Sequence, residues 1–575
     1  MRKLLKFLRG YGKECILGPL FKLLEASFEL LIPLVVAAIV DTGISAGDRG
    51  YVVKMCIVMI ALGIIGLVCA VTAQYFAAKA AVGFATRLRH AVMKHILGLS
   101  YTEIDTLGTS TMVTRMTSDI NQVQNGVNLT LRLLLRSPFV VFGAMIMAFT
   151  IDVEAALTFA ALIPLLCLVV FGIMLITMPM YKRVQESLDR VTSSTRQNLS
   201  GVRVLRAFVM ERAEEEAFCG HTAQLQDRQR KAGRISNLMN PMTLVMVNVA
   251  VVVLINIGAV KVHAGILTQG LVIALYNYMT QILVELVKMA NLIISMTKAA
   301  ACADRVAGVL EIESSQKNGA YRPEKIRGDV EFRNVTAAYK GAAESSLDQI
   351  SFHAEAGQTI GIIGGTGSGK TTLINLIPRL YDAAQGQILI DGVDVREYDF
   401  VSLRQNIGLV PQKSVLFKGT IRSNLLWGNE NATEAELWDA LEIAQGREVV
   451  KSKERELDSE VAQNGANFSG GQRQRLAIAR ALVRKPAILI LDDSASALDY
   501  ATDARLRQAI RNMENPPTTL IVSQRAASVR YADQILVLDD GELVGIGTHD
   551  ELIETCAVYQ EVFYSQFPKE VKAHG

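Results

Sequence analysis

Six stretches of the chain are predominantly apolar, and all of them lie before residue 297. They are found at 16–40, 52–78, 133–150, 155–178, 244–262 and 271–296. A helix that crosses a bilayer needs about 17 to 25 predominantly apolar residues. The pattern therefore predicts six transmembrane helices.

The connections between these stretches differ in length and in charge. Three are short and carry few cations, at 41–51, 151–154 and 261–270, whereas those at 79–132 and 181–240 are long and rich in Lys and Arg. Cationic loops stay on the cytoplasmic side of a membrane. We therefore expect a multi-pass protein of the cytoplasmic membrane, with the long connections and both chain ends in the cytoplasm. The basic N-terminus is expected to form a short helix on the membrane surface.

The two long connections do not read as disordered loops. Residues 84–99 and 181–218 keep apolar residues at helical spacing among the charges, which predicts that the membrane helices extend into the cytosol. The turns of these extensions, around 101–107 and 203–215, would then lie furthest from the membrane. They are in a position to dock onto whatever binds a nucleotide.

The pattern changes after residue 310. Residues 313–323 are polar and contain Gly and Pro, as linkers do, and from 330 onward short β-branched runs alternate with helical patterns. Such alternation predicts an α/β domain with a mostly parallel sheet. Strands are expected at 359–363, 388–390, 407–410, 487–491, 518–522 and 534–538. The predicted organisation is a transmembrane domain at 1–310, a linker at 311–329 and a soluble domain at 330–575.

Composition supports a membrane protein and excludes some classes. Half of the 575 residues are hydrophobic, and the net charge of +3 does not suggest a nucleic-acid binder. The seven cysteines are scattered without a Cys-x-x-Cys pair, so neither a disulfide framework nor a metal site is expected from them.

A few ionisable residues lie inside the predicted spans. The most notable are Glu25, Glu29, Glu285 and Lys288. Charged groups at membrane depth usually face a cavity or a partner. The alternative is that Glu285 and Lys288, three residues apart on one helix face, pair with each other; the sequence leaves both open.

A glycine-rich stretch, GGTGSGKT, stands between a predicted strand and a helical pattern at 372–380. It fits the phosphate-binding loop pattern G-x-x-x-x-G-K-[ST] at every fixed position. Backbone N–H groups at such a turn converge on phosphate oxygens at a helix N-terminus. The predicted nucleotide-binding residues are Gly364, Gly365, Thr366, Gly367, Ser368, Gly369, Lys370, Thr371 and Thr372. Lys370 is expected at the β- and γ-phosphates and Thr371 at Mg²⁺, so the predicted fold is a six-span α-helical domain followed by an α/β P-loop nucleotide-binding domain.

Two further motifs follow the phosphate loop. The apolar run AILILD ends at Asp492, which is placed to hold the Mg²⁺ shell beside Thr371. A Ser-Gly-Gly-Gln turn, made of Ser469, Gly470, Gly471 and Gln472, opens a helix and forms a second anion-binding helix start. One triphosphate does not need two such sites in one domain. The second turn is therefore expected to bind a nucleotide held by another chain.

With SGGQ as its signature motif, the chain resembles an ATP-binding-cassette (ABC) exporter half-transporter of the multidrug-exporter-like type. The resemblance covers essentially the whole length, from the basic N-terminal helix to the closing cassette. It implies ATP and Mg²⁺ as cofactors. Tyr339 resembles the aromatic residue that stacks on adenine, and Gln412 the glutamine that contacts Mg²⁺ and the γ-phosphate. Asp499, at the end of SALD, resembles the residue of the loop that crosses the dimer seam, and the tips at 101–107 and 203–215 resemble the two coupling helices.

The chain departs from the family pattern in its own catalytic residues. The family has Glu after the metal-binding Asp, where this chain has Asp493, and a later His at the γ-phosphate, where it has Gln524. A carboxylate displaced by roughly 1 Å can cost on the order of a hundredfold in rate, and glutamine cannot become cationic. Before the signature, the family commonly has Glu at the position of Gln463 and Gly at the position of Ala462.

These departures predict a nucleotide site that binds but hydrolyses weakly, in a chain whose signature can complete a second site. We expect a heterodimer with a different half-transporter; a homodimer with slow, Asp-supported hydrolysis is the alternative. The expected function is ATP-driven export of a hydrophobic drug, lipid or peptide, in contact with membrane lipid and without nucleic acid. An ATP-gated channel and a membrane-tethered ATPase machine are rivals, although a tether would need only one helix.

Overall fold

The computed structural model describes residues 2–342, 344–494 and 496–567. It divides into two compact units, which we call the membrane unit and the cassette unit. The membrane unit comprises Met1–Leu97 and Thr109–Ile312, and the cassette unit comprises Gly98–Gly108 and Glu313–Gly575. The domain limits expected from the sequence stay a prediction, and the segment Gly98–Gly108 is grouped here with the cassette.

The described part of the membrane unit is helical. Its α-helices are α1 (Gly12–Ala38), α2 (Arg49–Leu97), α4 (Thr109–Thr114), α5 (Ile120–Leu133), α6 (Arg136–Ile151), α7 (Val153–Ser200), α8 (Val202–Ala207), α9 (Glu211–Ser236), α10 (Met239–His263) and α11 (Gln269–Leu310). A short 3-10 helix, η1 (Arg2–Leu8), precedes them, and two π-helical turns, η2 (Ile39–Ile44) and η3 (Arg115–Asp119), interrupt them.

Six continuous helical segments of the described chain are long and apolar enough to cross a membrane. They are Gly12–Ile44, Arg49–Leu97, Thr109–Ile151, Val153–Ser200, Glu211–His263 and Gln269–Leu310. The prediction of six spans is confirmed. The lengths of up to 53 residues exceed what a bilayer needs, as expected if the helices continue beyond it.

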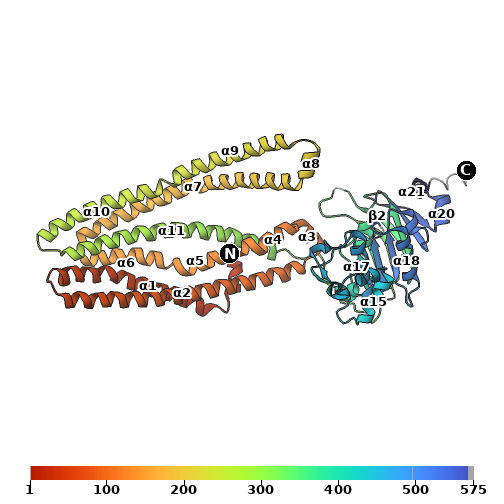
Figure 1. Ribbon diagram of the computed structural model, residues 1–575, viewed down its shortest axis with the longest axis horizontal. Helices are drawn as coiled ribbons and strands as arrows, with labels where there is room; N and C mark the ends of the chain where they lie inside the picture. The colour runs from red at the N-terminus through yellow and green to blue at the C-terminus, as the bar shows by residue number, and fades with distance from the viewer. Residues whose placement is uncertain (1, 343, 495, 568–575) are drawn as a thin grey trace. The chain divides into compact units, whose positions relative to one another are not determined.

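The second long connection forms a helical arm. Figure 1 shows α7 and α9, in yellow, running side by side with the short helix α8 between them at the tip. Gly201 ends α7, and the backbone N–H of Leu205 bonds back to its carbonyl, which turns the chain into α8. The expected turn around 203–215 therefore contains α8 and the first turn of α9.

The spans pack through small residues and turn larger apolar ones outward. On α2, Ala73 and Ala77 are fully buried, while Ile60 and Ile64 are exposed. A Cβ added at Gly18 of α1 would lie 3.5 Å from the backbone nitrogen of Ala77, so the two backbones approach closely. Close approach through small residues is how helices associate in lipid, where large apolar side chains gain nothing by leaving the surface.

The ionisable residues inside the spans form a network. Glu285 of α11, which is 1% exposed, accepts from Lys288 at 2.8 Å, from Arg136 of α6 at 2.5 Å and from Ser137 at 2.9 Å. Arg136 also donates to Glu29 of α1 at 2.6 Å. The pairing of Glu285 with Lys288 is confirmed, and the sequence did not predict Arg136 as the central partner.

The cassette unit contains three sheets. Its strands are β1 (Val330–Ala337), β2 (Leu347–Ala354), β3 (Thr359–Gly364), β4 (Gln385–Ile390), β5 (Val393–Asp394), β6 (Ile407–Val410), β7 (Gly419–Thr420), β8 (Glu460–Val461), β9 (Ile488–Asp492), β10 (Thr518–Val522), β11 (Gln534–Asp539) and β12 (Glu542–Gly547). The largest sheet has the order β12-β11-β3-β10-β9-β6 and is parallel except for β12. The mostly parallel sheet is therefore confirmed.

A second sheet, of order β2-β1-β4-β5, is antiparallel and was not predicted. The run at 388–390 belongs to this sheet, as part of β4, and not to the parallel one. Short apolar runs look alike in the sequence, whichever sheet they join. The third sheet is the pair β7 and β8.

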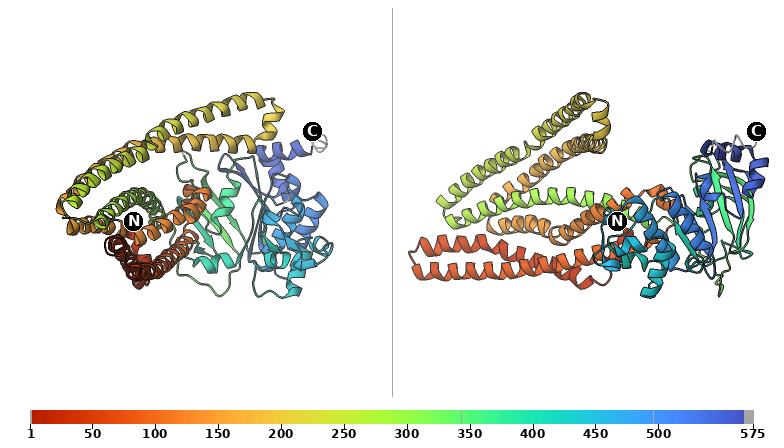
Figure 2. Two further views of the ribbon diagram at one scale, coloured as in Figure 1. Left: turned by 60° about the vertical axis from the view of Figure 1, so that its left-hand side comes forward. Right: turned by 45° about the vertical axis from the view of Figure 1, so that its right-hand side comes forward.

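Helices surround these sheets (Figure 2). They are α3 (Tyr101–Leu107), α12 (Lys370–Leu376), α13 (Phe400–Gln405), α14 (Ile421–Leu425), α15 (Glu434–Ile443), α16 (Arg447–Lys451), η4 (Glu456–Asp458), η5 (Gln463–Gly465), α17 (Gly470–Val483), α18 (Tyr500–Arg511), α19 (Ala526–Val529), α20 (His549–Thr555) and α21 (Ala557–Gln566). The helix expected at 372–380 is α12, which begins two residues earlier and ends at Leu376.

The parallel sheet is buried on both faces. In β9, Ile490 packs into a core shared with the antiparallel sheet and α12, while the neighbouring Leu489 and Leu491 pack into a second core with α17 and α18. Successive side chains of a strand point to opposite faces. This explains why the sequence of β9 is continuously apolar, and it leaves the polar ends of the strands as the place for a site.

Candidate functional site

The phosphate loop lies where β3 ends and α12 begins. Gly369, with φ +89°, precedes the helix, and a Cβ there would lie 2.5 Å from the carbonyl oxygen of Ser346. Only glycine fits such a position without strain. The ammonium of Lys370 donates to the Gly364 carbonyl at 3.0 Å and to the Ser368 hydroxyl at 3.1 Å, so it is folded back over its own loop.

Thr371 and Asp492 face each other at the head of this loop. The Thr371 hydroxyl lies 3.3 Å from both carboxylate oxygens of Asp492, the last residue of β9. Burial raises the pKa of Asp492, and burial lowers the pKa of Lys370. A hydroxyl and a carboxylate in contact are the oxygen ligands that Mg²⁺ prefers, so the donor set fits the ion.

A cavity of about 660 Å³ opens over the loop. Most of the predicted nucleotide residues line it: Tyr339, Thr366, Gly367, Gly369, Lys370, Thr371, Thr372, Gln412, Asp492, Asp493 and Gln524. Gly364 and Ser368 are buried in the same loop, and Gly365 is exposed but is not among the lining residues. The structure therefore brings together residues from five parts of the sequence at the carboxyl ends of parallel strands.

Asp493 leaves the end of β9 in an unusual backbone conformation. Its φ is +44°, in the left-handed region that few non-glycine residues adopt. Its N–H bonds the Val522 carbonyl at 3.0 Å, and its carboxylate accepts from the Gln412 amide at 3.4 Å. The carboxylate is thus held at the cavity wall next to the proposed metal ligand Asp492.

The signature turn is a separate helix start. Ser469 is the N-cap of α17, and its hydroxyl accepts from the Gln472 N–H. In return, the Ser469 N–H donates to the side-chain oxygen of Gln472. Asp499 caps α18 without such a reciprocal bond: its carboxylate accepts from the N–H and from the hydroxyl of Thr502. Neither Ser469–Gln472 nor Asp499 is among the residues that line the cavity.

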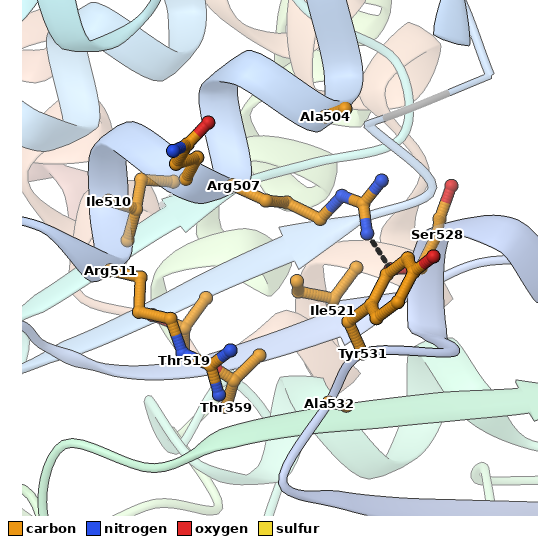
Figure 3. Close-up of a pocket in the computed structure, with 11 residues that line it drawn as sticks. Thr359, Ala504, Arg507, Ile510, Arg511, Thr519, Ile521, Ser528, Tyr531 and Ala532 are labelled. Carbon is orange, nitrogen blue, oxygen red and sulfur yellow. Dashed lines mark hydrogen bonds between the residues drawn. The ribbon is translucent and has the colours of Figure 1, made fainter. Parts of the chain in front are cut away.

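A second cavity, of about 220 Å³, lies near the opposite ends of the strands (Figure 3). It is lined by Thr359 and Thr519 at the starts of β3 and β10 and by Arg507 of α18. Arg507 pairs with Asp503 at 3.1 Å and donates to the Ser528 carbonyl at 3.1 Å. Its charge is used within the fold, so the nucleotide is assigned to the first cavity.

Sequence reasoning missed two residues beside the first cavity. The Tyr381 hydroxyl donates to Asp105 of α3 at 2.6 Å, and the Tyr381 ring packs on Tyr339 with 5.2 Å between ring centroids. Asp105 lies in the tip at 101–107 that the sequence singled out, but its role was not predicted, and no motif marks Tyr381. The only signal is an aromatic residue five positions after α12.

Comparisons with known proteins agree with this geometry. The sequence profile of the ABC transporter transmembrane region matches residues 15–286, and that of the ABC transporter ATP-binding region matches 347–496. An uncharacterized ABC transporter ATP-binding protein of Mycobacterium tuberculosis is 38% identical over 569 residues, 97% of each chain. The chain belongs to the ABC transporter family.

Other relatives of this ABC transporter extend over nearly the whole chain. The uncharacterized ABC transporter ATP-binding protein YfiB of Bacillus subtilis is 35% identical over 570 residues, 99% of each chain. The ATP-dependent lipid A-core flippase of Yersinia pestis is 28% identical and covers 98% of this chain and 97% of its own. The structure of a bacterial Atm1-family ABC exporter with ATP bound aligns with a TM-score of 0.80, at 22% identity, over 96% of this chain and 98% of its own, which shows the shared fold.

The transporter therefore combines one ABC transporter transmembrane region with one ABC transporter ATP-binding cassette, in the fold that the Atm1-family exporter also has. It is a multi-pass membrane protein and an ATPase coupled to transport. These findings confirm the resemblance to ABC transporters, while the multidrug type and the heterodimer with unequal sites stay predictions. The roles of the individual site residues stay predictions.

Proposed function

We propose that the transporter exports an apolar or amphipathic solute across the cytoplasmic membrane as one half of a heterodimer whose two nucleotide sites are unequal. The observation that carries this proposal is the content of its own cavity, where Asp493 and Gln524 stand at the positions of the hydrolytic groups. The signature turn of the same chain keeps every expected residue. A weak site and an intact signature in one chain are expected when a second, different chain supplies a better site.

ATP binding in the chain's own cavity would use the residues already described. The adenine is expected to stack on Tyr339, and the phosphates to meet the backbone N–H groups of the loop and the ammonium of Lys370. Mg²⁺ would be held by Thr371, Asp492 and Gln412, where it would neutralise phosphate charge. Both termini and the cassette would lie on the cytoplasmic side, where ATP is available.

Weak hydrolysis follows from the reach of two side chains. The Asp493 carboxylate is one methylene shorter than glutamate and is already within 3.4 Å of Gln412. A base must come within about 2.6–3.2 Å of the water from which it takes a proton. Gln524 lines the same cavity, but its amide is uncharged, so it can offer a γ-phosphate only a neutral hydrogen bond. The site is therefore expected to hold ATP longer than it hydrolyses it.

The signature turn is proposed to complete the partner's site. Ser469 and Gln472 begin the 14-residue helix α17 with their capping bonds already made, so the N-terminus is preorganised for an anion. Asp499 would lie at the seam between the two cassettes. In this arrangement the chain contributes its signature turn to the competent site and its phosphate loop to the weak site.

A groove on the cassette unit supports dimerisation. It has a volume of about 430 Å³, and its walls include Leu380 and the stacked rings of Phe417 and Trp427, whose centroids are 4.0 Å apart. The tip of the membrane unit's arm carries Phe208 and Val209, which are 74% and 82% exposed. Large exposed apolar residues of this kind mark interaction sites. We propose that the arm tip of the partner half binds in this groove and that the arm tip of this chain binds in the partner's groove.

Charge favours the same assignment. The groove is lined by Arg404, Arg480 and Arg484, whose guanidiniums donate to backbone carbonyls. Burial lowers the pKa of each of these arginines. Four glutamates, Glu211, Glu214, Glu215 and Glu216, follow the arm tip in α9. Because α8 itself carries Arg203 and Arg206, the charge complement to the groove would come from the glutamates at the start of the partner's α9 and not from α8.

The proposed cycle is alternating access. ATP would bring the two cassettes together, the arm tips and α3 would transmit the closure, and hydrolysis at the competent site would reset it. ATP can drive this change only through a higher affinity for the closed state. The apolar spans suit a hydrophobic drug, a lipid or a peptide, and the flippase relative of Yersinia pestis favours a lipid among these.

A homodimer is the second candidate, because Asp493 keeps a carboxylate at the cavity wall. The heterodimer and the homodimer are distinguished by isolating the tagged chain from its native cells in mild detergent. Its partner is then identified by mass spectrometry. We expect a different half-transporter in equal amount, and ATP-dependent solute accumulation in inverted vesicles that contain both. Recovery of a second, differently tagged copy of this chain with brisk ATPase activity would establish the homodimer, and ATPase without accumulation would favour a channel or a tethered machine.

A further inference from the structure

Three tyrosines of the cassette unit stand in a row from the nucleotide cavity to α3. The rings of Tyr339 and Tyr381 meet edge to face, with centroids 5.2 Å apart and planes at 85°. Tyr381 then meets Tyr101 of α3, with centroids 6.0 Å apart and planes at 53°. Edge-to-face and tilted pairs at these separations are attractive and have a defined geometry. A change in the position of one ring is therefore expected to change the position of the next.

Hydrogen bonds fix both ends of this row. The Tyr381 hydroxyl donates to the Asp105 carboxylate at 2.6 Å, and the Tyr339 hydroxyl lies 3.1 Å from the hydroxyl of Thr372 in α12. Burial and the hydrogen bond to Asp105 raise the pKa of Tyr381, so its hydroxyl stays a donor at neutral pH. Ser100, which precedes α3, adds a contact of 3.0 Å with Ser315 of the linker. Helix α3 is thus anchored on the cassette at its start and near its end.

The chain connects α3 directly to the membrane unit. It follows α2 after three residues and precedes α4 after one. Whatever moves α3 therefore pulls on two helices of the membrane unit through covalent bonds. The sequence alone identified α3 as a possible docking tip but gave no contact for it.

We propose that Tyr381 is a positioning residue that makes α3 respond to the base of the nucleotide, through Tyr339, and not only to its phosphates. This inference rests on the proposed function, in which adenine stacks on Tyr339. A base on one face of the Tyr339 ring restricts that ring, Tyr381 packs against it, and the hydroxyl of Tyr381 holds α3. ATP bound at a site that hydrolyses poorly would in this way still change the position or mobility of α3.

The test is hydrogen–deuterium exchange on the whole transporter with its partner, in lipid nanodiscs. Exchange is followed at 101–107 and at 364–372, with saturating Mg-ATP or with Mg-tripolyphosphate, which lacks a base. We expect ATP to slow exchange in both segments and tripolyphosphate to slow it only at 364–372. In Tyr381→Leu, ATP should still protect 364–372, while its effect on 101–107 falls by about fivefold or more, the lower end of typical coupling between sites.

The matched control is Tyr321→Leu. Tyr321 is another partly exposed tyrosine of the cassette unit that packs edge to face on a tyrosine, Tyr398, with 5.0 Å between ring centroids. This substitution should leave the response of 101–107 to ATP unchanged. A general loosening of the cassette would instead affect both variants alike.

The outcomes are distinguishable. The inference is overturned if ATP protects 101–107 equally in the natural protein and in Tyr381→Leu, or if tripolyphosphate protects 101–107 as strongly as ATP. Failure of ATP to protect 364–372 in the natural protein would instead contradict the proposed nucleotide site. If Tyr381→Leu releases α3 even without nucleotide, Tyr381→Phe decides, because it keeps the ring and loses only the bond to Asp105. A reduced ATP effect at 101–107 then supports the inference, and an unchanged one overturns it.

Discussion

Arg136 holds Glu285 across the interior of the membrane unit, with 2.5 Å between a guanidinium nitrogen and a carboxylate oxygen. Because Arg136 also reaches Glu29 at 2.6 Å, one side chain joins α1, α6 and α11. Arg136 and Glu285 are 6% and 1% exposed, respectively. Charges this deep are tolerated only when they are paired, and removal of one partner leaves the other without compensation.

Replacement of Arg136 by Ala is therefore expected to destabilise the membrane unit strongly. Breaking a buried ion pair costs about 3–5 kcal/mol in soluble proteins, and we expect a fall in Tm of several degrees in detergent. The double variant with Arg136→Met and Glu285→Gln should recover part of the loss, because it removes both buried charges together, whereas Glu29 and Lys288 are partly exposed and can remain charged without them. Arg212→Ala is the control, since the Arg212–Glu216 pair is exposed and should contribute almost nothing. Equal Tm values for Arg136→Ala and the natural protein would contradict this role.

The weak site should improve when its missing groups are restored. To observe it alone, the partner's site is silenced by Ser469→Arg in this chain. On that background, Asp493→Glu is expected to raise ATP turnover about tenfold or more, since misplacement by 1 Å can cost on the order of a hundredfold. The combination with Gln524→His should raise it further.

The control for this gain is Asp539→Glu, which lengthens an exposed carboxylate at the end of β11. It should leave turnover unchanged. A double variant that hydrolyses ATP no faster than the background would show that the two substitutions do not limit the site. Colorimetric phosphate release at saturating Mg-ATP is a sufficient measurement.

The arm tip is expected to contribute to dimer stability through Phe208. A large aromatic side chain that fills a groove can lose about 2 kcal/mol or more of binding free energy when cut to Ala. Phe208→Ala should therefore shift the dimer dissociation midpoint, measured by native mass spectrometry, by roughly 30-fold in concentration. Leu199→Ala, at a residue of α7 that is 71% exposed, is the control. Identical dissociation midpoints for Phe208→Ala and Leu199→Ala would show that the arm tip does not contribute to the dimer interface.

Asp399 predicts a pH dependence in the linker. Hydrogen bonds from Asn318 and from the Ser402 N–H lower the pKa of Asp399 from 3.8 to about 2. A carboxyl with a lowered pKa stabilises the fold above its unfolded value of 3.8 and loses that effect as the pH falls towards 2. Pepsin cleavage at 313–323 should therefore accelerate as the pH falls from 4 to 2. In Asp399→Asn, cleavage should already be fast at pH 4 and depend less on pH; a natural-like profile would contradict the assignment.

The spans and the parallel strands could be predicted because their signals are local. The run at 518–522 has the bounds of β10, and the helix expected from residue 372 after the phosphate loop begins only two residues earlier, at Lys370. Each depends on residues within one short segment, so periodicity and motif spacing were sufficient.

Contacts between distant segments could not be predicted. The antiparallel sheet pairs β1 with β4, about 55 residues away in sequence, and Arg136 meets Glu285 across 149 residues. Tyr381 and Asp105 are 276 residues apart. A single sequence contains no information on which of many apolar or charged residues will meet, because those choices are made by packing in three dimensions.

The central claim is that this chain hydrolyses ATP poorly in its own cavity and completes a better site on its partner. The most direct measurement is the ATPase rate of the purified transporter, with its partner, after Asp493→Asn and after Ser469→Arg. The account predicts that Asp493→Asn retains most of the activity and that Ser469→Arg loses nearly all of it. Near-total loss with Asp493→Asn would show that Asp493 is the working base and would contradict the account.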